Sequence, residues 1–465
     1  MDILLTHGYF LAEDAAEQKI MKPYPPLGLL YLSAYLKNRG LKVDLFDSTF
    51  ASLDQLKQHI ELTRPPVVGI YVNLITRRNA LKITEFCKTI GIRVVAGGPE
   101  PANYPDEYLS HGVDVVVAGE GEATLEELLP YVREMNREAL KKIHGIFFLD
   151  ERNELVAMPA RAVIADLNTL TFPDREAIDL NVYLDCWQEH HGLRPVSLIT
   201  ARGCPYNCQW CSHSVFGHSH RRRSPENVAD ELVWINEKYR PDQVWYADDV
   251  FTMNHKWLAR YARELETRGL YFPFEAISRE DRLDEEVIKT LKRMGCYRLW
   301  VGAESGSQKI LDKMDRRTNA KRMQKMINLL QKHGIQAGTF IMVGYVEEEW
   351  DDLSDTVKHL KAAMPDEVLT TLSYPIKGTP FYREVSRRII SRIPWAEGSD
   401  RDLSFQGRGT VRFYHHAQRW IKNEWQSHMA IHKKPFSPKR FVKCWLLAKK
   451  ARIGMWLTRG EREMG

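Results

Sequence analysis

Short apolar segments alternate with helical stretches along the first 135 residues, and this alternation limits the fold more than any other feature of the chain. The expected strands are Ile3–Leu5, Val43–Phe46, Val67–Val72, Val94–Ala96 and Val115–Val117. Expected helices separate them at Leu27–Arg39, Leu53–Thr63, Asn79–Ile90 and from Thr124 onward. Strands and helices that alternate at this spacing are typical of a parallel, doubly wound sheet. The sequence therefore predicts an α/β, Rossmann-like domain at residues 1–140.

A second alternating series follows a predicted hairpin and linker at residues 141–190. The hairpin is expected to turn at Asp150–Asn153, and a proline-containing connector continues to about Asn181. The strands of the second series are expected at Ser197–Thr200, Gln243–Tyr246, Phe274–Ile277, Arg298–Val301, Gly338–Val343 and Leu369–Leu372. Helices are expected near 226–238, 255–268, 284–294, 307–314, 319–333 and 350–363. Six such units predict a partial (β/α)6 barrel at residues 191–385, with its active site at the carboxyl ends of the strands.

Three cysteines follow the first strand of this second series. Cys204, Cys208 and Cys211 are spaced C-x-x-x-C-x-x-C. Three thiolates can hold three corners of a 4Fe-4S cluster and leave the fourth iron open, whereas electron-transfer clusters and structural zinc sites are closed by four ligands. The alternatives are a zinc site completed by His213 or three unrelated thiols. The remaining cysteines are scattered and form no disulfide framework, so a reducing cytoplasm is the expected setting.

Polar side chains also follow the later strands of the second series. Asp248 and Asp249 come directly after the second strand, where paired carboxylates are destabilising unless a cation engages them. The alternative is a solvated helix cap. Arg279 follows the third strand and is a candidate partner for a carboxylate, either Asp249 or one on a ligand. Glu304 and Ser305 end the fourth strand, and Ser305 could equally cap the next helix.

The cysteine motif in this context resembles radical S-adenosylmethionine (SAM) enzymes with an N-terminal cobalamin-binding domain, over roughly residues 1–380. The resemblance implies that the open iron binds SAM and that an electron from the cluster cleaves it to a 5′-deoxyadenosyl radical. By the same resemblance Trp210 lies near the adenine, unless it is only a core aromatic. Asp248 and Asp249 take the place of the family's Gly-Gly-Glu motif, and Glu304 accepts hydrogen bonds from the ribose hydroxyls. Tyr345 stands where most relatives have Gly-x-Pro-Gly-Glu, so the adenine contacts are expected to differ there.

Small-residue loops at strand ends of the first domain carry the cobalamin part of the resemblance. Gly98 and Pro99 follow one strand, and Gly119 and Gly121 follow the next, where they allow a large ligand to approach the backbone. The family's Asp-x-His-x-x-Gly motif, which supplies a histidine to cobalt, is absent. His7 is the only early histidine, and it could as easily be structural. The lower axial ligand is therefore expected to be missing, water or another side chain.

The C-terminal region, residues 386–465, is expected to be basic and mostly helical. Residues 405–465 carry 14 Lys and Arg against three Asp and Glu. One expected helical face is formed by Val442, Trp445, Leu446, Ile453, Trp456 and Leu457. Such a helix can lie on an anionic membrane surface, grip an anionic substrate or RNA, or simply pack on the barrel.

The resemblance implies an oxygen-sensitive enzyme that uses a 4Fe-4S cluster, SAM and cobalamin to functionalise an unactivated carbon, with methyl transfer as the commonest chemistry. Cyclisation or rearrangement, of the anaerobic magnesium-protoporphyrin ester cyclase type, is the alternative. An iron–sulfur protein that binds nucleic acid or acts as a sensor is the alternative from another class. The expected partners are a small-molecule or lipid-like substrate and a reductant such as flavodoxin or ferredoxin, without nucleic acid. We expect a cytoplasmic protein with peripheral membrane contact through its basic helix.

Overall fold

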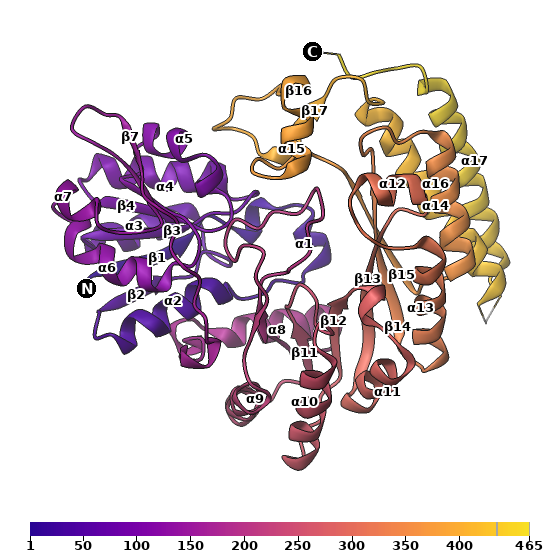
Figure 1. The fold of residues 1–465 in the computed structure, drawn as a ribbon, viewed down its shortest axis with the longest axis horizontal. Coiled ribbons are helices and arrows are strands. Elements are labelled where there is room, and N and C mark those ends of the chain that lie inside the picture. Colours follow the sequence, from indigo (N-terminus) through magenta and orange to yellow (C-terminus); the bar gives the residue numbers. More distant parts are fainter. Residues whose placement is uncertain (434–435, 465) are drawn as a thin grey trace. The chain divides into compact units, whose positions relative to one another are not determined.

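The computed structural model describes residues 1–433 and 436–464, which fold into two compact units (Figure 1). The first unit contains Met1–Pro205, Ser212–Gln243 and Ile393–Arg401. The second contains Tyr206–Cys211, Val244–Arg392 and the chain from Asp402 onward. The cysteine loop is thus divided, with Cys204 in the first unit and Cys208 and Cys211 in the second. The α/β class predicted from the sequence is confirmed.

A seven-stranded sheet forms the centre of the first unit, in the order β2-β1-β3-β4-β5-β6-β7. Strands β1 to β5 are parallel, and the β6–β7 hairpin adds two antiparallel strands at one edge. This hairpin was predicted, and its pairing of Phe148 with Val156 confirms it. The strands span Ile3–His7, Val43–Phe46, Val67–Tyr71, Arg93–Gly97, Val115–Val117, Ile146–Leu149 and Leu155–Ala157.

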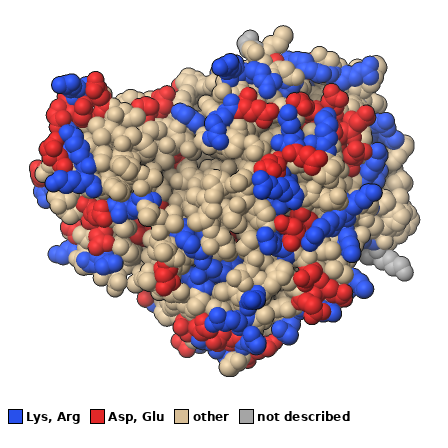
Figure 2. Space-filling model, in the orientation of Figure 1, with Lys and Arg blue, Asp and Glu red and all other residues tan. Residues whose placement is uncertain are grey.

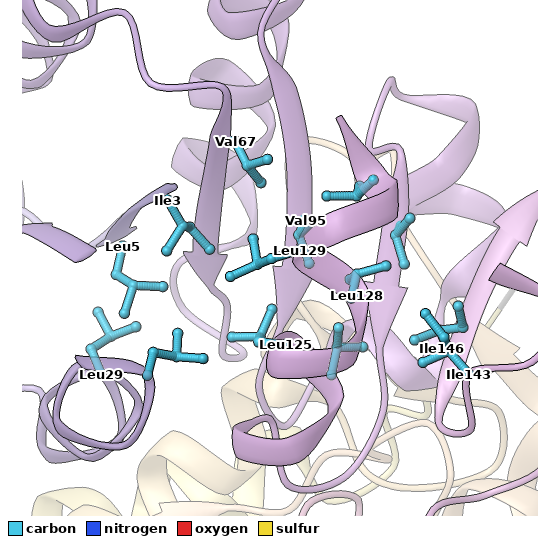
Figure 3. Packing of buried hydrophobic residues seen from close by; sticks show 14 of the residues in the cluster. Ile3, Leu5, Leu29, Val67, Val95, Leu125, Leu128, Leu129, Ile143 and Ile146 are labelled. Carbon is cyan, nitrogen blue, oxygen red and sulfur yellow. The ribbon is translucent and has the colours of Figure 1, made fainter. Parts of the chain in front are cut away.

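Apolar side chains cover both faces of this sheet. On one face, Leu29 of α2 and Leu125 and Leu128 of α6 pack against Ile3 and Val95 of the strands (Figure 3). The other face is covered by α3, α4 and α5. Because each face is buried under helices, the central strands are apolar throughout, as parallel sheets require. The helices span Leu27–Asn38 (α2), Leu53–Thr63 (α3), Arg77–Thr89 (α4), Pro105–Ser110 (α5) and Glu122–Val132 (α6), with short turns at Glu17–Ile20 (α1) and Arg137–Leu140 (α7).

A twelve-residue helix, α8 (Leu180–His191), lies where the sequence predicts a linker. Its start is capped by Asp179, whose carboxylate accepts the N–H of Asn181, and it ends at Gly192 in the left-handed region. Leu180, Tyr183 and Trp187 face the interior at helical spacing. The proline-containing connector was expected to continue to about Asn181, and this helix, which was not predicted from the sequence, begins there.

A late segment of the chain, Ile393–Arg401, packs into the first unit beside α4. The buried Arg77 guanidinium binds Glu100 (Nε to Oε1, 2.5 Å) and Asp400 (Nη2 to Oδ1, 2.9 Å). It also lies over the rings of Tyr104 and Trp395. The buried Arg77 cation is thus paired with two carboxylates. Because one of them is Asp400, this ion pair holds the segment Ile393–Arg401 in the first unit.

In the second unit the strands are parallel and follow the order β15-β14-β13-β12-β11. They span Gln243–Tyr246 (β11), Phe274–Ser278 (β12), Cys296–Glu304 (β13), Gln336–Val343 (β14) and Glu367–Leu372 (β15). The helices between them are His255–Thr267 (α10), Glu285–Met294 (α11), Gln308–Lys313 (α12), Ala320–Lys332 (α13) and Trp350–Ala363 (α14). Each of these elements was predicted to within a few residues. A short helix, Pro380–Val385 (α15), and a two-stranded sheet, β16 (Ile389–Ile390) with β17 (Ser404–Phe405), follow.

The strand before the cysteine loop, β8 (Pro195–Leu198), belongs to the first unit. So do the helix α9 (Pro225–Tyr239) and a small antiparallel pair, β9 (Ala201–Arg202) with β10 (Arg221–Arg222). This pair joins the two ends of the loop that carries the cysteine motif, because it brings Arg202 opposite Arg221.

Two long helices, α16 (Val411–His432) and α17 (Pro438–Thr458), end the second unit and pack against each other. The side of α17 that is buried carries Cys444, Ala448, Ala451, Met455 and Thr458. Gly454 allows close approach, because a Cβ at this position would lie 2.5 Å from the His416 ring. The larger apolar residues predicted to form one face are instead exposed. The chain as described contains no helix that is both long enough and apolar enough to cross a membrane.

Candidate functional site

The second half of the cysteine loop is anchored to the second unit through Gln209. The Gln209 N–H donates to the Met314 carbonyl (3.1 Å), and its own carbonyl accepts from the N–H of Phe381 (2.9 Å). On either side of this anchor, Cys208 is buried and Cys211 is exposed. Trp210 is half-buried against an apolar cluster that includes Tyr345 and Phe381. The core-aromatic alternative for Trp210 is thus compatible with its surroundings.

Arg279 lies beside one cysteine of the motif. Its Nη1 lies 3.7 Å from Cys208 Sγ, its Nε donates to Asp281 (2.9 Å) and its Nη2 donates to the Arg316 carbonyl (2.9 Å). The guanidinium also stacks on Tyr206, 3.6 Å from the ring centroid. Burial raises the pKa of the Cys208 thiol, and the Arg279 charge opposes that rise. Arg279 therefore favours a thiolate at Cys208, and the pairing with Asp249 that the sequence suggested is not among its contacts.

Glu304 ends β13 in an unusual backbone conformation. Its φ of 61° lies in the left-handed region, and the Ser305 N–H donates to the Ala303 carbonyl across it (2.7 Å). A γ-turn of this hand is rare and strained, and such strain gathers at functional sites. The pairing of β13 with β14 also shifts register between Gly302 and Glu304. Such a β-bulge changes the direction in which the Glu304 side chain points.

The Glu304 carboxylate lies over Gly302. A Cβ at position 302 would come within 2.7 Å of Glu304 Oε1 and 3.1 Å of Arg316, so a larger residue there would displace the Glu304 carboxylate. Burial raises the pKa of Glu304 to about 8, while Arg279 acts to lower it and Glu280 to raise it. The described residues make no hydrogen bond to this carboxylate. It is therefore available to a ligand hydroxyl or ammonium group.

Asp248 and Asp249 follow β11 but differ in environment. Asp248 is buried, with 2% of its surface exposed, whereas Asp249 is exposed. The adjacent Tyr246 hydroxyl is hydrogen-bonded to Tyr261 (2.8 Å) and packs in the strand's core. Because the two carboxylates do not share one environment, a ligand reaching this strand end from solvent would meet Asp249 first.

Ser305 and Tyr345 are both completely buried. The Ser305 hydroxyl accepts the N–H of Ser307 (3.1 Å) and lies 3.3 Å from Thr356 Oγ1, and the cap position of α12 is taken by Ser307. The alternative of Ser305 as the cap of this helix is therefore wrong. Tyr345 packs on Phe381 with ring centroids 4.7 Å apart, and its hydroxyl has no hydrogen-bond partner among the described residues.

In the first unit, the Gly119–Glu122 loop holds the base of the cysteine loop. Glu120 binds Arg202 (2.8 Å) and Arg221 (2.8 Å), and Glu122 binds Arg202 (2.6 Å). All four side chains are at most 10% exposed. This network joins the sheet's strand end to β9 and β10, close in sequence to Cys204.

The small residues predicted to approach cobalamin lie at the carboxyl ends of β4 and β5. Gly98 has a φ of 109°, and a Cβ there would lie 2.5 Å from the Val72 carbonyl oxygen. Pro99 accepts a hydrogen bond from Ser214 (2.6 Å). Gly119 has a φ of 79° and no side-chain neighbour within 4 Å, whereas Gly121 lies under Leu32. Gly98 and Gly119 are half-buried at the carboxyl ends of two central strands, which is where ligands of such sheets bind.

His7 is engaged on both ring nitrogens. Nδ1 accepts the N–H of Tyr9 (3.2 Å), so Nε2 carries the proton that it donates to Asp47 (3.0 Å). Burial alone would raise the pKa of Asp47, but hydrogen bonds from His7, Thr49 and Tyr183 hold it below its ordinary value. The structural alternative for His7 is therefore favoured over a role as cobalt ligand.

The donor set for an iron–sulfur cluster consists of three thiols within eight residues. His213, the fourth ligand of the zinc alternative, stacks on His218 with ring centroids 4.0 Å apart. In residues 1–433 and 436–464 no three His, Cys, Asp or Glu side chains are grouped closely enough to hold a metal ion. The fit of the cluster thus depends on the thiol chemistry and spacing and on the cation at Cys208. These features, with the glycine loops at the carboxyl ends of β4 and β5, suit an open iron–sulfur site and a second large ligand.

Family models agree with both parts of this description. A model of the radical SAM superfamily matches residues 198–360, and a model of the B12 binding domain matches residues 18–129. The chain is therefore a radical SAM enzyme with an N-terminal cobalamin-binding domain, and its cofactors are a 4Fe-4S cluster, SAM and cobalamin. As such an enzyme it acts on a small molecule and takes electrons from an external reductant.

Curated and solved relatives span most of the chain. An uncharacterised methyltransferase of Pyrococcus horikoshii, PH0819, is 28% identical over 400 residues, covering 82% of this chain and 83% of that protein. The anaerobic magnesium-protoporphyrin IX monomethyl ester cyclase of Rubrivivax gelatinosus is 25% identical over 399 residues, covering 84% and 71%. The radical SAM methyltransferase TsrM of Kitasatospora setae has the same fold, with a TM-score of 0.73 at 16% identity over 99% of both chains.

Sequence reasoning missed Tyr206, Asp281 and Arg316, which surround Arg279. Tyr206 lies within the cysteine motif, and Asp281 is two residues after Arg279. Their proximity in sequence to predicted site residues was the available signal. No such signal existed for Arg316. Its carbonyl meets Arg279 only because the chain folds back after α12.

Proposed function

We propose that this enzyme transfers a methyl group to an unactivated carbon of a small organic molecule. The observation that carries the proposal is that one chain contains both cofactor domains and spans 83% of a methyltransferase relative. When bound, SAM and the cluster supply a 5′-deoxyadenosyl radical and cobalamin supplies the methyl group. The cyclase relative supports radical cyclisation as a second candidate.

Different residues of the chain would bind the cluster and SAM. Cys204, Cys208 and Cys211 would bind the cluster, and Arg279 would keep positive charge beside Cys208. Glu304 would accept hydrogen bonds from the ribose, because its carboxylate is free and aimed by a strained turn.

The other predicted contacts belong to the same proposal. Asp248 and Asp249 would meet the ammonium group of SAM, and Trp210 would border the adenine. Ser305 and Tyr345 would support this end of the barrel. Gly98, Pro99, Gly119 and Gly121 would face cobalamin in residues 1–140, with the barrel at 191–385.

The direct test is a product analysis under anaerobic conditions. We expect protein loaded with iron, sulfide and cobalamin to form 5′-deoxyadenosine from SAM when a strong reductant or reduced flavodoxin is present. With SAM labelled on its methyl group, the label should enter a product in extracts of the source cells. Deoxyadenosine formation with products that never carry the label would favour cyclisation, and no deoxyadenosine would contradict the enzyme mechanism.

Helix α17 supports peripheral membrane contact as part of the proposal. Its exposed side carries Val442, Trp445, Leu446, Ile453, Trp456 and Leu457, each at least 44% exposed. The helix contains six Lys and Arg and no Asp or Glu. In Figure 2, uncharged surface lies beside Lys and Arg side chains at the edge where Figure 1 labels α17. Apolar anchors with basic neighbours are the features that bind a helix to an anionic membrane surface.

We expect the double variant Leu446→Glu/Leu457→Glu to bind vesicles containing phosphatidylglycerol more weakly than the unchanged protein. Because burying each Leu contributes about 1.5–3 kcal/mol, the loss should be about tenfold or more. Sedimentation with vesicles measures it. The control is Leu62→Glu, since Leu62 is 77% exposed on α3. Equal binding by the double variant and the control would contradict membrane contact through α17.

A further inference from the structure

A pocket of about 840 Å³ opens in the second unit, and no residue of the cysteine motif lines it. It lies between the loop after β14 (residues 345–350), the strand β17, the start of α16 and the end of α17. This volume is within the range of about 300–1,000 Å³ that small-molecule sites occupy. The cluster cysteines and the predicted cobalamin contacts do not line it, and of the predicted SAM contacts only Tyr345 does.

The walls of the pocket are rich in aromatic side chains. They are Trp350, Phe405, Phe413, Tyr414 and Trp456. Phe405 and Tyr414 are buried, whereas Trp456 is 55% exposed at the mouth. Aromatic walls of this kind favour a ligand with a flat apolar body, because ring faces give large contact areas.

Three buried polar groups on residues that line the pocket have no hydrogen-bond partner among the described residues. They are the Tyr345 hydroxyl, Glu348 Oε1 and Arg408 Nε, on residues that are 0%, 8% and 6% exposed. A buried polar group without a partner costs about 1–3 kcal/mol, so three at one cavity indicate that something else satisfies them.

Arg408 defines the charge of the ligand. Its Nη1 donates to the Ser373 carbonyl (2.8 Å), and its guanidinium lies 4.9 Å from the Phe405 ring centroid. No carboxylate of the described chain forms an ion pair with it. Burial lowers the pKa of Arg408, and the charge of Glu463, which is itself paired with Arg392, opposes this only in part. A buried cation without a counter-ion is destabilising, and an anionic ligand would remove that cost.

The remaining charges at the pocket also favour an anion. Glu348 accepts the Gly344 N–H at 2.5 Å, and burial raises its pKa to about 8, so it is mostly uncharged at neutral pH. Arg388, Arg459 and Arg462 are exposed at the rim. The exposed Glu347 is paired with Lys313, and Glu349 is the other acidic group at the rim.

We propose that this pocket binds an organic anion with a flat, apolar body, whose carboxylate or other acidic group reaches Arg408. The ligand's ring system would lie between the aromatic walls, and Tyr345 and Glu348 would hydrogen-bond its acidic group. This site does not depend on the proposed methyl transfer, although it shares Tyr345 with the predicted SAM contacts.

The test uses the full-length protein and two probes that share a ring system, 2-naphthoate and the neutral 2-naphthalenemethanol. In calorimetric titrations we expect naphthoate to bind at least about tenfold more tightly, because charge-assisted hydrogen bonds are the stronger ones. Arg408→Gln should weaken the binding of naphthoate by about tenfold or more and leave the binding of the alcohol unchanged. Arg412→Gln removes the same charge from an exposed arginine outside the pocket. It should change the affinity for neither probe.

A second pair of variants keeps the test independent of folding. Arg459→Gln, at the exposed rim, should weaken naphthoate by about twofold to threefold. Trp456→Ala should weaken both probes, since it removes part of the aromatic wall. Naphthoate binding no tighter than that of the alcohol, or equal effects of Arg408→Gln and Arg412→Gln, would overturn the proposal. So would naphthoate affinity that neither Arg459→Gln nor Trp456→Ala changes.

Discussion

Replacing Cys208 with alanine is expected to abolish both iron–sulfur cluster assembly and SAM cleavage. Cys208 is the buried cysteine of the motif, and Arg279 stands beside its sulfur at 3.7 Å. Loss of residues that merely support metal ligands costs about 10–100-fold in metal affinity or activity, so loss of a ligand itself should exceed about 100-fold. Iron and sulfide content, the visible absorbance of the cluster and 5′-deoxyadenosine formation measure the effect.

The matched control is Cys186→Ala. Cys186 is also largely buried, on α8 of the first unit, but it is not part of the motif. This variant should keep its iron and its SAM cleavage. His213→Ala adds a test of the zinc alternative, because a cluster held by the three cysteines should retain its iron without this imidazole. Unchanged iron content in Cys208→Ala, or iron lost from His213→Ala, would contradict the assigned ligand set.

Much of the fold follows from local patterns in the sequence. The strands β2, β5 and β11 and the helix α3 have the bounds that were predicted, because turn residues and capping side chains mark their ends. Ser52 and Gln55, for example, form a reciprocal cap at the start of α3. The helix α8 carried equally clear signals in Asp179 and Gly192, but the prolines before it suggested a linker.

The exposed side of α17 could not be predicted from periodicity alone. Hydrophobic spacing predicted one apolar face, and α17 has that face, but small residues face α16 instead. The small residues Ala448, Ala451 and Gly454 allow α17 to pack closely on α16. The sequence pattern does not indicate which of the two faces of α17 makes this contact.

The details of the candidate site show the same limit. The cysteines were singled out by their spacing, and Arg279 and Glu304 because they follow strands that the sequence predicts. The contacts of Arg279 were not found, since they depend on side chains that only the fold brings together. The left-handed turn at Glu304 was also hidden, because a glutamate gives no local signal for a positive φ.

Glu231→Gln is expected to destabilise the first unit by about 3–5 kcal/mol, because it removes the buried negative charge that binds the guanidinium groups of Arg175 and Arg223. Glu231 on α9 binds Arg175 (3.0 Å) and Arg223 (2.5 Å), and both Arg175 and Glu231 are completely inaccessible to solvent. The amide keeps the shape of the side chain but removes its charge. The variant thus separates charge from packing. Urea unfolding and hydrogen exchange along α9 measure the loss.

Glu237→Gln is the matched control, since Glu237 is exposed on the same helix and should change stability by no more than about 0.5 kcal/mol. A second comparison tests the direction of the charge effect. Arg175→Met together with Glu231→Gln removes one cation with the anion, so it should be less destabilising than Glu231→Gln alone. If the double variant is instead the less stable of the two, hydrogen bonding and packing outweigh the unpaired charge in this core. If Glu231→Gln is no less stable than Glu237→Gln, water must reach Arg175, Glu231 and Arg223 and screen their charges.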